Sequence, residues 1–480
     1  SGMRESLYGL LCALMLGIAQ MCMYTGFDSS SFVVEPILHS VSNRAPGTID
    51  THAGYYGSAV CLVAYMFANL VAPWALGLLG SKLSLVLASS CLTLYFISFM
   101  YVHFIPYYLA SALMGVGFAL YYAGNGAYLT EHSSRDTIER NTTLVWTLGS
   151  FCMIIGGVVM LFTIKPPTGP PEISENKTAS INETIQQWDF RQFSDSEIRL
   201  MYGAFAGAAL LSNFLFAFLP KSAVANSLAK VNRRKHRIGL GEQLVKMGRT
   251  LADHRMVQIA PAFCLVGTTT TFWICVYPTT MTFTKKLSEH VYLPAYYSIV
   301  LGSAEIIMGC IIMVLSKRIR NFAQMPTLVI GAILYMTGAL LALLSTPAWS
   351  TNTPNDDRTL WFEPSVEIVL LIALLFGLAD NCFNTSRGVI AALVIPDQSA
   401  QVFSIAKFYQ TVIACILTFL ASWLSVPAYF VLITINIVIG LILFGRVAAK
   451  THKNEQKITE ATNGEAEAIP EKKIIHDMDH

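Results

Sequence analysis

Residues 366–390 read VEIVLLIALLFGLADNCFNTSRGVI, a long apolar run that carries Asp380 near its middle. An α-helix rises about 1.5 Å per residue, so about twenty apolar residues cross the roughly 30 Å hydrocarbon layer of a bilayer. Lipid tolerates only backbone whose hydrogen bonds are closed, and a run this long exceeds the length of a barrel strand. The stretch therefore predicts a transmembrane helix.

Similar runs recur along the whole chain, which has 480 residues, 54% hydrophobic and 13% charged. Soluble domains are about a quarter charged, so this composition indicates a surface that faces lipid. We expect an all-α membrane protein with two pseudo-symmetric six-helix bundles, the major facilitator fold. The twelve predicted spans are 7–28, 54–79, 82–103, 105–130, 141–164, 200–219, 256–278, 295–316, 326–346, 366–390, 403–425 and 427–446.

The distribution of Lys and Arg predicts the orientation, because cytoplasmic loops of membrane proteins are enriched in these residues. The loop 220–255 carries nine of them, whereas the loop 165–198 carries six acids and three cations. Both termini are therefore expected in the cytoplasm and 165–198 outside. Two glycosylation acceptors in this outer loop, Asn176 and Asn182, agree with that orientation. The plasma membrane and an endolysosomal membrane both fit.

The predicted domains follow from the same pattern. Residues 1–2 precede Met3 and are interpreted as a cloning remnant, 3–219 form the first bundle, and 256–446 form the second. The basic segment 220–255 links them, as expected for two repeats packed face to face. Its charge is either a topology determinant or an attraction to anionic lipid. The polar tail 447–480 has no apolar periodicity and is expected to be disordered.

Arg387, near the cytoplasmic end of 366–390, is counted with the cytoplasmic cations. Apart from such charges at span ends, four ionisable residues lie within the spans, where charge is costly and marks candidate functional residues: Asp28, Glu305, Asp380 and Lys407. They avoid the spans that would be peripheral in a major facilitator arrangement, so a central cavity could hydrate them. Asp380 and Lys407 are expected at similar depth, which suggests a salt bridge. Glu305 is either a proton-coupling carboxylate or a protonated side chain that bonds a neighbouring helix.

Corresponding places in the two halves carry similar polar stretches. Small residues at four-residue spacing precede the first stretch and predict close packing of another helix: Ser111, Gly115, Ala119 and Ala123. Residues 125–130 (NGAYLT) then correspond to 380–385 (DNCFNT), which suggests a gene duplication. Asn125, Asn381 and Asn384 are the amide side chains that a solute or a neighbouring helix would use.

At these residues the chain resembles the ion-channel regulatory protein family, the uncoordinated-ninety-three-like branch of the major facilitator superfamily. Within it, the chain is most similar to members described as major facilitator domain-containing. The resemblance implies twelve helices in two bundles and implies that Glu305, Asp380 and Lys407 sit at positions the family keeps polar. The matching stretches are 54–56 (GYY), 69–73 (NLVAP), 124–126 (GNG), 129–130 (LT), 302–305 (GSAE), 377–385 (GLADNCFNT) and 405–410 (IAKFYQ).

The chain also departs from this pattern. Asp28 stands where the resemblance implies a neutral polar residue. In the superfamily that the chain resembles, the loop between the second and third spans normally carries an acid and several arginines, and it latches the alternate states of typical transporters. Here that signature is reduced to 77–82 (GLLGSK). Its loss weakens the case for ordinary alternating-access transport.

Two functions remain open: a carrier of a small solute coupled to protons through Glu305 or Asp28, and a non-transporting regulator or chaperone of an ion-channel subunit or another membrane protein. An enzyme is not expected, since no nucleophile–base pair, metal cluster or phosphate loop stands out. No cofactor or metal is expected either, because all ten cysteines lie within apolar runs and none shows metal-site spacing. A net charge of +2 gives no reason to expect nucleic acid.

Overall fold

The computed structural model describes residues 2–134, 137–164, 191–223, 227, 239–319, 321–394 and 399–467, and the protein is 82% helical. Twelve helical segments are long and apolar enough to cross a membrane, which confirms the number of spans expected from sequence. The predicted acceptors Asn176 and Asn182 lie outside the described residues.

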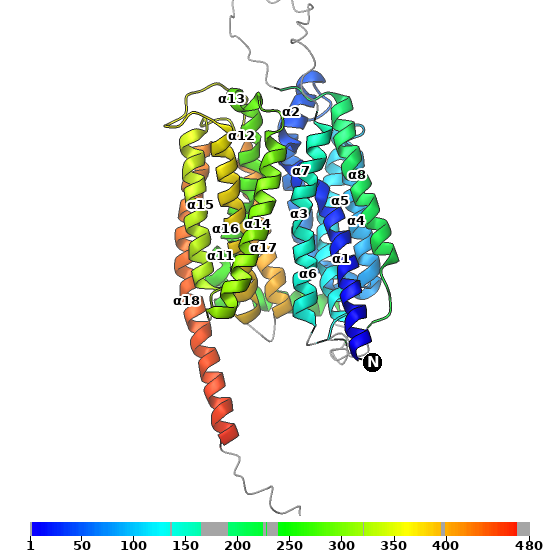
Figure 1. Ribbon diagram of the computed structural model, residues 1–480, viewed down its shortest axis with the longest axis vertical. Helices are drawn as coiled ribbons and strands as arrows, with labels where there is room; N and C mark the ends of the chain where they lie inside the picture. Colours follow the sequence, from blue (N-terminus) through cyan, green and yellow to red (C-terminus); the bar gives the residue numbers. More distant parts are fainter. Residues whose placement is uncertain are drawn as a thin grey trace, which may run out of the picture.

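The first half comprises α1 (Gly2–Ser31), α2 (Val34–Arg44), α3 (Ala53–Leu79), α4 (Ser81–Ser98), α5 (Phe104–Glu131), α6 (Ile138–Ser150), α7 (Cys152–Thr163) and α8 (Asp195–Phe218). Its fifth span is divided between α6 and α7 at Phe151. The short helix α2 lies outside the predicted spans. It caps the end of the bundle opposite the N-terminus, which we call the upper end (Figure 1).

The second half comprises α11 (His254–Thr271), η1 (Phe272–Val276), α12 (Tyr277–Phe283), α13 (Lys285–Ser288), α14 (Leu293–Arg318), α15 (Met325–Ser345), α16 (Val366–Leu393), α17 (Ser399–Phe419), η3 (Leu420–Ser422) and α18 (Val426–Glu467). The segments α11, η1 and α12 together form its first span. A further helix, α10 (Leu240–Leu251), lies in the basic segment that precedes this half.

The last helix differs from the sequence-based expectation, because it runs on to Glu467 instead of ending near 446. Residues 447–460 are rich in Ala, Lys, Gln and Glu, which are good helix formers, and they contain no Gly or Pro. The apolar span therefore provides an existing helix that these residues extend at low cost, since nucleation is already complete. Residues 447–467 were expected to be disordered, and this expectation is wrong because they are helical.

The two halves repeat one packing pattern. α5 packs on α3 and α4 in the first half, just as α16 packs on α14 and α15 in the second. A Cβ on Gly115 would lie 2.1 Å from the carbonyl oxygen of Cys61, and one on Gly377 would lie 2.4 Å from that of Leu301. Small residues at equivalent places thus permit equivalent close approaches, and the small-residue packing expected around Gly115 is confirmed.

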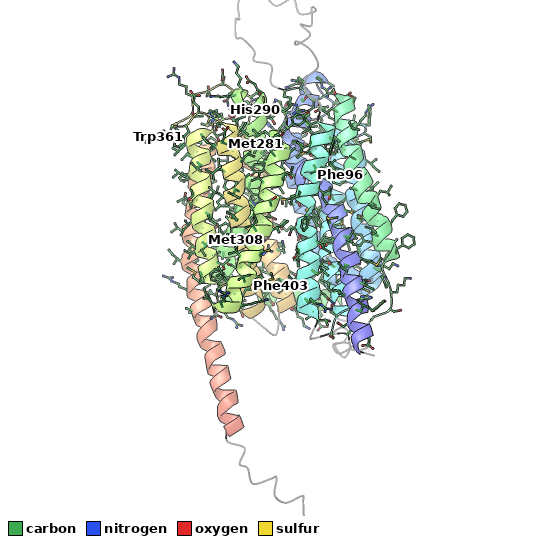
Figure 2. All side chains as sticks on the ribbon, in the orientation of Figure 1. Phe96, Met281, His290, Met308, Trp361 and Phe403 are labelled. Carbon is green, nitrogen blue, oxygen red and sulfur yellow. The ribbon has the colours of Figure 1, made fainter. Side chains whose placement is uncertain are left out.

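The halves stand side by side (Figure 1) and meet along two seams, α7 against α14 and α3 against α17. The N-terminus and the long end of α18 lie at the same, lower end of the molecule. Figure 2 shows the side chains that cover both halves, with His290 and Trp361 at the upper end.

Candidate functional site

A π-helical turn shapes the second half at the centre of the molecule. In η1 the N–H of Tyr277 bonds the carbonyl of Phe272, five residues back. Pro278 follows and has no N–H to give to the carbonyl of Ile274, so the regular α-helical pattern cannot continue here. Such turns are rare and occur frequently at functional sites.

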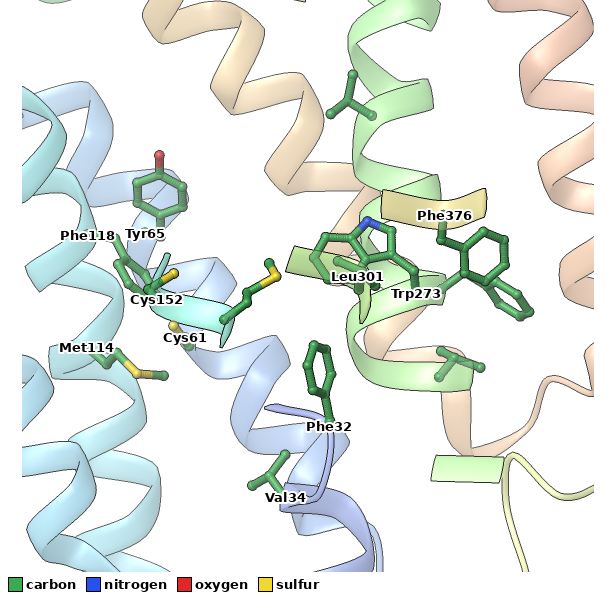
Figure 3. Packing of buried hydrophobic residues seen from close by; sticks show 14 of the residues in the cluster. Phe32, Val34, Cys61, Tyr65, Met114, Phe118, Cys152, Trp273, Leu301 and Phe376 are labelled. Carbon is green, nitrogen blue, oxygen red and sulfur yellow. The ribbon is translucent and has the colours of Figure 1, made fainter. Parts of the chain in front are cut away.

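Trp273 lies in this turn and bonds Asp380 on α16. The indole Nε1 donates a 3.0 Å hydrogen bond to Oδ1 of Asp380, and the Asn384 amide donates one of 2.7 Å to Oδ2. Phe32 of the first half packs against the Trp273 ring at a centroid distance of 6.3 Å (Figure 3). Asp380 therefore sits where the two halves meet, with both of its oxygens bonded.

These bonds overturn the predicted salt bridge between Asp380 and Lys407. Among the described residues no ion pair joins them, although they interact electrostatically. The Lys407 ammonium lies instead over the ring of Tyr122, 5.1 Å from its centroid. Similar depth in two helices does not fix the direction in which each side chain points around its own helix axis.

Arg387 brings a second cation to this region. It is on the same helix as Asp380 and donates a hydrogen bond from Nη1 to Oε1 of Gln410 on α17. It interacts electrostatically with Asp380 and with Tyr65 and Tyr122 of the first half. From sequence, Arg387 was expected among the cytoplasmic cations and not in the central site. Its spacing of seven residues from Asp380, which places both on one face of a helix, was the signal that could have identified it.

Two further carboxylates, on different helices, interact electrostatically with Asp380. Asp28 on α1 accepts a 3.2 Å hydrogen bond from the thiol of Cys152, and Glu305 on α14 interacts electrostatically with both Asp28 and Asp380. Within the described part of the chain, the Glu305 carboxylate has no hydrogen-bond or ion-pair partner. Three acids from both halves thus share one region with two cations. We call Asp28, Glu305 and Asp380 together the acidic group.

The three predicted amides have different surroundings. Asn384 bonds Asp380, whereas Asn381 faces α14, its amide nitrogen 3.3 Å from where a Cβ of Gly309 would lie. Asn125 is buried in α5, and no contact among the described residues joins it to the acidic group. Its Oδ1 is buried and has no hydrogen-bond partner within the described part of the chain. The structure therefore brings Asn384, but not Asn125, into the central site.

Hydrogen bonds across the halves concentrate towards the upper end. There Ser29 and Ser298 hydroxyls lie 3.1 Å apart, and the Tyr55 hydroxyl donates a 2.7 Å bond to the carbonyl of Thr351. Towards the lower end, Asn69 donates a 3.2 Å bond to the carbonyl of Ser404. In the part of the chain that the structure describes, the halves are joined more firmly above the acidic group than below it.

The reduced latch between the second and third spans is a one-residue turn. Gly80 separates α3 from α4 with a φ of +77°, a conformation that favours glycine. Lys82 donates a 2.9 Å bond to the carbonyl of Leu219 at the end of α8. This bond stays within the first half. Among the described residues, Lys82 makes no hydrogen bond or ion pair that would latch the first half to the second.

Comparison with known proteins places these features in context. A family model described as "Ion channel regulatory protein UNC-93" matches residues 45–445. The chain is 23% identical over 450 residues to UNC93-like protein MFSD11 of Xenopus laevis, which covers 91% of this chain and 95% of that protein. It is 21% identical over 423 residues to UNC93-like protein 3 of Arabidopsis thaliana, with coverage of 85% and 82%.

Solved structures with the same fold are membrane transporters. A peptide transporter POT in complex with sulfate aligns with a TM-score of 0.64 at 12% identity, covering 92% of this chain and 94% of that one. A D-xylose-proton symporter aligns with a TM-score of 0.58 at 14% identity, covering 93% and 97%. At these identities the likeness shows the fold and nothing further.

Proposed function

Since the chain belongs to the UNC-93 family of ion channel regulatory proteins and has the fold of major facilitator transporters, we propose that it carries a small anionic or zwitterionic solute together with protons. The observation that carries this proposal is the Glu305 carboxylate, which interacts electrostatically with Asp28 and Asp380 and has no hydrogen-bond or ion-pair partner among the described residues. One of the structural neighbours is itself a proton symporter by name.

The acidic group supplies the protonation step. Like charges repel strongly where water is scarce, so neighbouring carboxyl groups share protons instead of ionising independently. Asp28 belongs to the first half and Glu305 to the second, and a rearrangement of the halves changes the distance between them. Proton uptake and the rearrangement are coupled in this way.

The two cations of the central site, Lys407 and Arg387, would bind the solute. Lys407 lies over the Tyr122 ring, and Arg387 interacts electrostatically with Tyr65 and Tyr122 of the first half. Lys407 has no ion-pair partner among the described residues. A carboxylate or phosphate on the solute would pair with them and relieve the cost of keeping positive charge away from water. This chemistry favours an anionic or zwitterionic solute.

The proposal includes the expected orientation. Both termini lie in the cytoplasm, the upper end faces outward or into the lumen, and Asn176 and Asn182 carry glycans. The excess of Lys and Arg in 220–255 supports this orientation. The membrane is the plasma membrane or an endolysosomal membrane.

The test is solute-driven proton movement in proteoliposomes that hold the full chain and a pH-sensitive dye. Carboxylate-bearing probes, namely dipeptides, amino acids and dicarboxylates, are added one at a time. We expect at least one probe to change the internal pH with wild-type protein, and the change to be lost with Glu305→Gln. Glu289→Gln removes an exposed acid at the upper end and should keep the response.

A response that is equal in wild type and Glu305→Gln would contradict the assignment of Glu305. The absence of any response to every probe would favour the second candidate, a non-transporting regulator of a channel or another membrane protein. The family description and the loss of the latch favour that role. Co-purification of the chain with one defined channel subunit, unaffected by Glu305→Gln, is its expected signature.

A further inference from the structure

Three side chains that can bind metals converge at the upper end, away from the acidic group in the spans. They are Glu35 and His39 on α2 and His52 immediately before α3. One potential ligand atom from each lies within 4.8 Å of the other two. The carboxylate of Glu35 and the ring of His39 are buried, whereas the His52 side chain is 19% exposed.

The local sequence explains why these groups meet. Glu35 and His39 are four residues apart on one helix and therefore lie on the same face. Gly54, at the start of α3, allows α2 to pack directly on that helix, because a Cβ there would lie 2.5 Å from the Cα of Glu35. The close approach brings His52 against Glu35, with Nδ1 2.8 Å from Oε1.

We propose that Glu35, His39 and His52 form a binding site for one divalent transition-metal ion of the zinc type. Two imidazoles and one carboxylate are a ligand set that such ions accept in proteins, and a fourth position is then filled by water or another ligand. The partly exposed His52 marks the side from which the ion enters. The site does not depend on the proposed transport function.

The distances require only small movements. Zinc bonds its nitrogen and oxygen ligands at about 2.0–2.2 Å, so ligand atoms around a tetrahedral ion stand about 3.3–3.5 Å apart. Glu35 and His52 would separate by roughly half an ångström from their present 2.8 Å, and the widest pair would close by about 1.4 Å from the 4.8 Å limit. Rotations of side-chain torsions cover movements of this size.

The surroundings of Glu35 already resemble those of a metal ligand. The backbone N–H of Tyr55 donates a 3.0 Å hydrogen bond to Oε2 of Glu35, which orients the carboxylate and leaves Oε1 for the ion. Carboxylates that bind metals are commonly held by such second hydrogen bonds. The Glu35 side chain is only 2% exposed, so water competes little for it.

Protonation also favours metal binding near neutral pH. Burial, and secondarily the neighbouring His52, lower the pKa of His39 to about 4, so its imidazole is neutral and can donate a lone pair. Burial raises the pKa of Glu35, while hydrogen bonds from His52 and from the N–H groups of Tyr55 and Gly54 oppose that rise. An ion would displace any proton held by this group.

The site lies beside a contact between the halves. The His39 ring packs edge-on against Phe283 of the second half at a centroid distance of 5.0 Å, and Tyr55 bonds the carbonyl of Thr351. An ion that fixes α2 to α3 would therefore stiffen the surface on which the second half closes. Metal binding is expected to stabilise the closed upper end.

The test uses the purified full chain, treated with chelator and prepared with an affinity tag that contains no histidine. Zinc chloride is titrated calorimetrically, and cobalt chloride is added to follow visible absorption, which is intense when Co²⁺ is four-coordinate. We expect one ion per chain, a four-coordinate Co²⁺ spectrum, and a higher melting temperature with Zn²⁺, since binding stabilises the folded state. His39→Ala and His52→Ala should each lower the affinity at least tenfold.

His290→Ala is the matched control, because His290 is an exposed histidine at the same end (Figure 2) and is not among the three ligands. It should keep the wild-type affinity and spectrum. If His39→Ala fails to fold, His52→Ala, with its partly exposed side chain, decides the matter. Equal binding by wild type and His52→Ala, or no saturable binding by wild type, overturns the proposal and leaves only an ion pair between His52 and Glu35.

Discussion

The indole Nε1 of Trp273 donates a 3.0 Å hydrogen bond to Oδ1 of Asp380. The bond joins two helical segments of the second half, and the two residues are 107 positions apart in the sequence. Trp273 lies within the π-helical turn η1, and its partner lies on α16. The bond holds one of the three central carboxylates in place, whereas Glu305 has no such partner in the part of the chain that the structure describes. Asp380 is thus the fixed member of the acidic group.

The first prediction follows from that bond. Trp273→Phe keeps an aromatic ring but removes the donor, which leaves one oxygen of Asp380 without its partner. Leaving a buried polar group without its hydrogen-bond partner costs about 1–3 kcal/mol. We expect a lower melting temperature of the purified protein. Trp361→Phe, at a residue 78% exposed, is the control and should melt like wild type.

The second prediction concerns Gly54. An added Cβ would lie 2.5 Å from the Cα of Glu35, a backbone atom that cannot move without shifting α2. Overpacking of this kind typically costs about 1–3 kcal/mol, so Gly54→Ala should lower the melting temperature. Gly207→Ala is the control, because nothing lies within 4 Å of its added Cβ. Its melting temperature should stay the same or rise, since Ala favours a helix interior over Gly.

The third prediction concerns the pH dependence of stability. The pKa of His39 is about 4 in the folded protein, against an ordinary 6.5, because of burial and then His52. Below pH 6.5 the unfolded chain therefore binds a proton that the folded protein does not. The stability from this group is complete above pH 6.5 and is lost as the pH falls towards 4, by about 3 kcal/mol in total.

Glu35, which lies next to His39, acts in the opposite direction. Burial raises its pKa, so its ionisation costs stability above that pKa and the cost disappears as the pH falls. Melting temperatures measured from neutral pH down to about pH 5 separate the two groups. We expect His39→Gln to flatten the decline seen in wild type, whereas His290→Gln leaves it unchanged. A decline as steep in His39→Gln as in wild type would exclude His39 as its source.

The fourth prediction concerns Arg191, which joins the halves at the upper end. Its Nη1 donates a 2.9 Å bond to the carbonyl of Val291 and its Nη2 donates a 2.5 Å bond to Glu197. Burial lowers the pKa of Arg191, and Glu197 opposes that shift. Breaking a buried ion pair by removing one partner costs about 3–5 kcal/mol, so Arg191→Gln should destabilise the protein strongly.

Arg199→Gln is the matched control for this prediction. Arg199 lies in the same helix as Glu197 but donates its 2.9 Å bond to the carbonyl of Met100 within its own half. It should change the melting temperature little. A similar loss in both variants would mean that Arg191 acts as an ordinary surface cation and not as a link between the halves.

Much of the fold follows from sequence alone, and the reason is physical. Runs of about twenty apolar residues have few structures open to them in lipid, so the twelve spans could be predicted. The close approach at Gly115 could also be predicted, because small residues at helical spacing have a direct steric meaning. The continuation of α18 to Glu467 could not, because polarity alone does not distinguish a solvated helix from a disordered tail.

The candidate site was predicted less completely. Asp28, Glu305 and Asp380 stood out because charge is rare in apolar spans. Trp273 could not stand out, since one aromatic residue in an apolar run carries no sign of the partner it will bond. A salt bridge between Lys407 and Asp380 was predicted because the two residues lie at similar depth in the membrane. In the structure, Trp273 and Asn384 instead bond the oxygens of that carboxylate. The rotation of each helix around its axis was the missing information.

The central claim is that Glu305 couples protons to movement of a solute. The most direct measurement compares two modes of transport by Glu305→Gln in the same proteoliposomes, with whichever probe moves protons with the wild-type protein. Exchange of labelled for unlabelled solute needs no net proton release, whereas uptake driven by a pH gradient does. We expect Glu305→Gln to keep exchange and to lose gradient-driven uptake, because a neutral amide cannot release a proton. Gradient-driven uptake at the wild-type rate in this variant would contradict the claim.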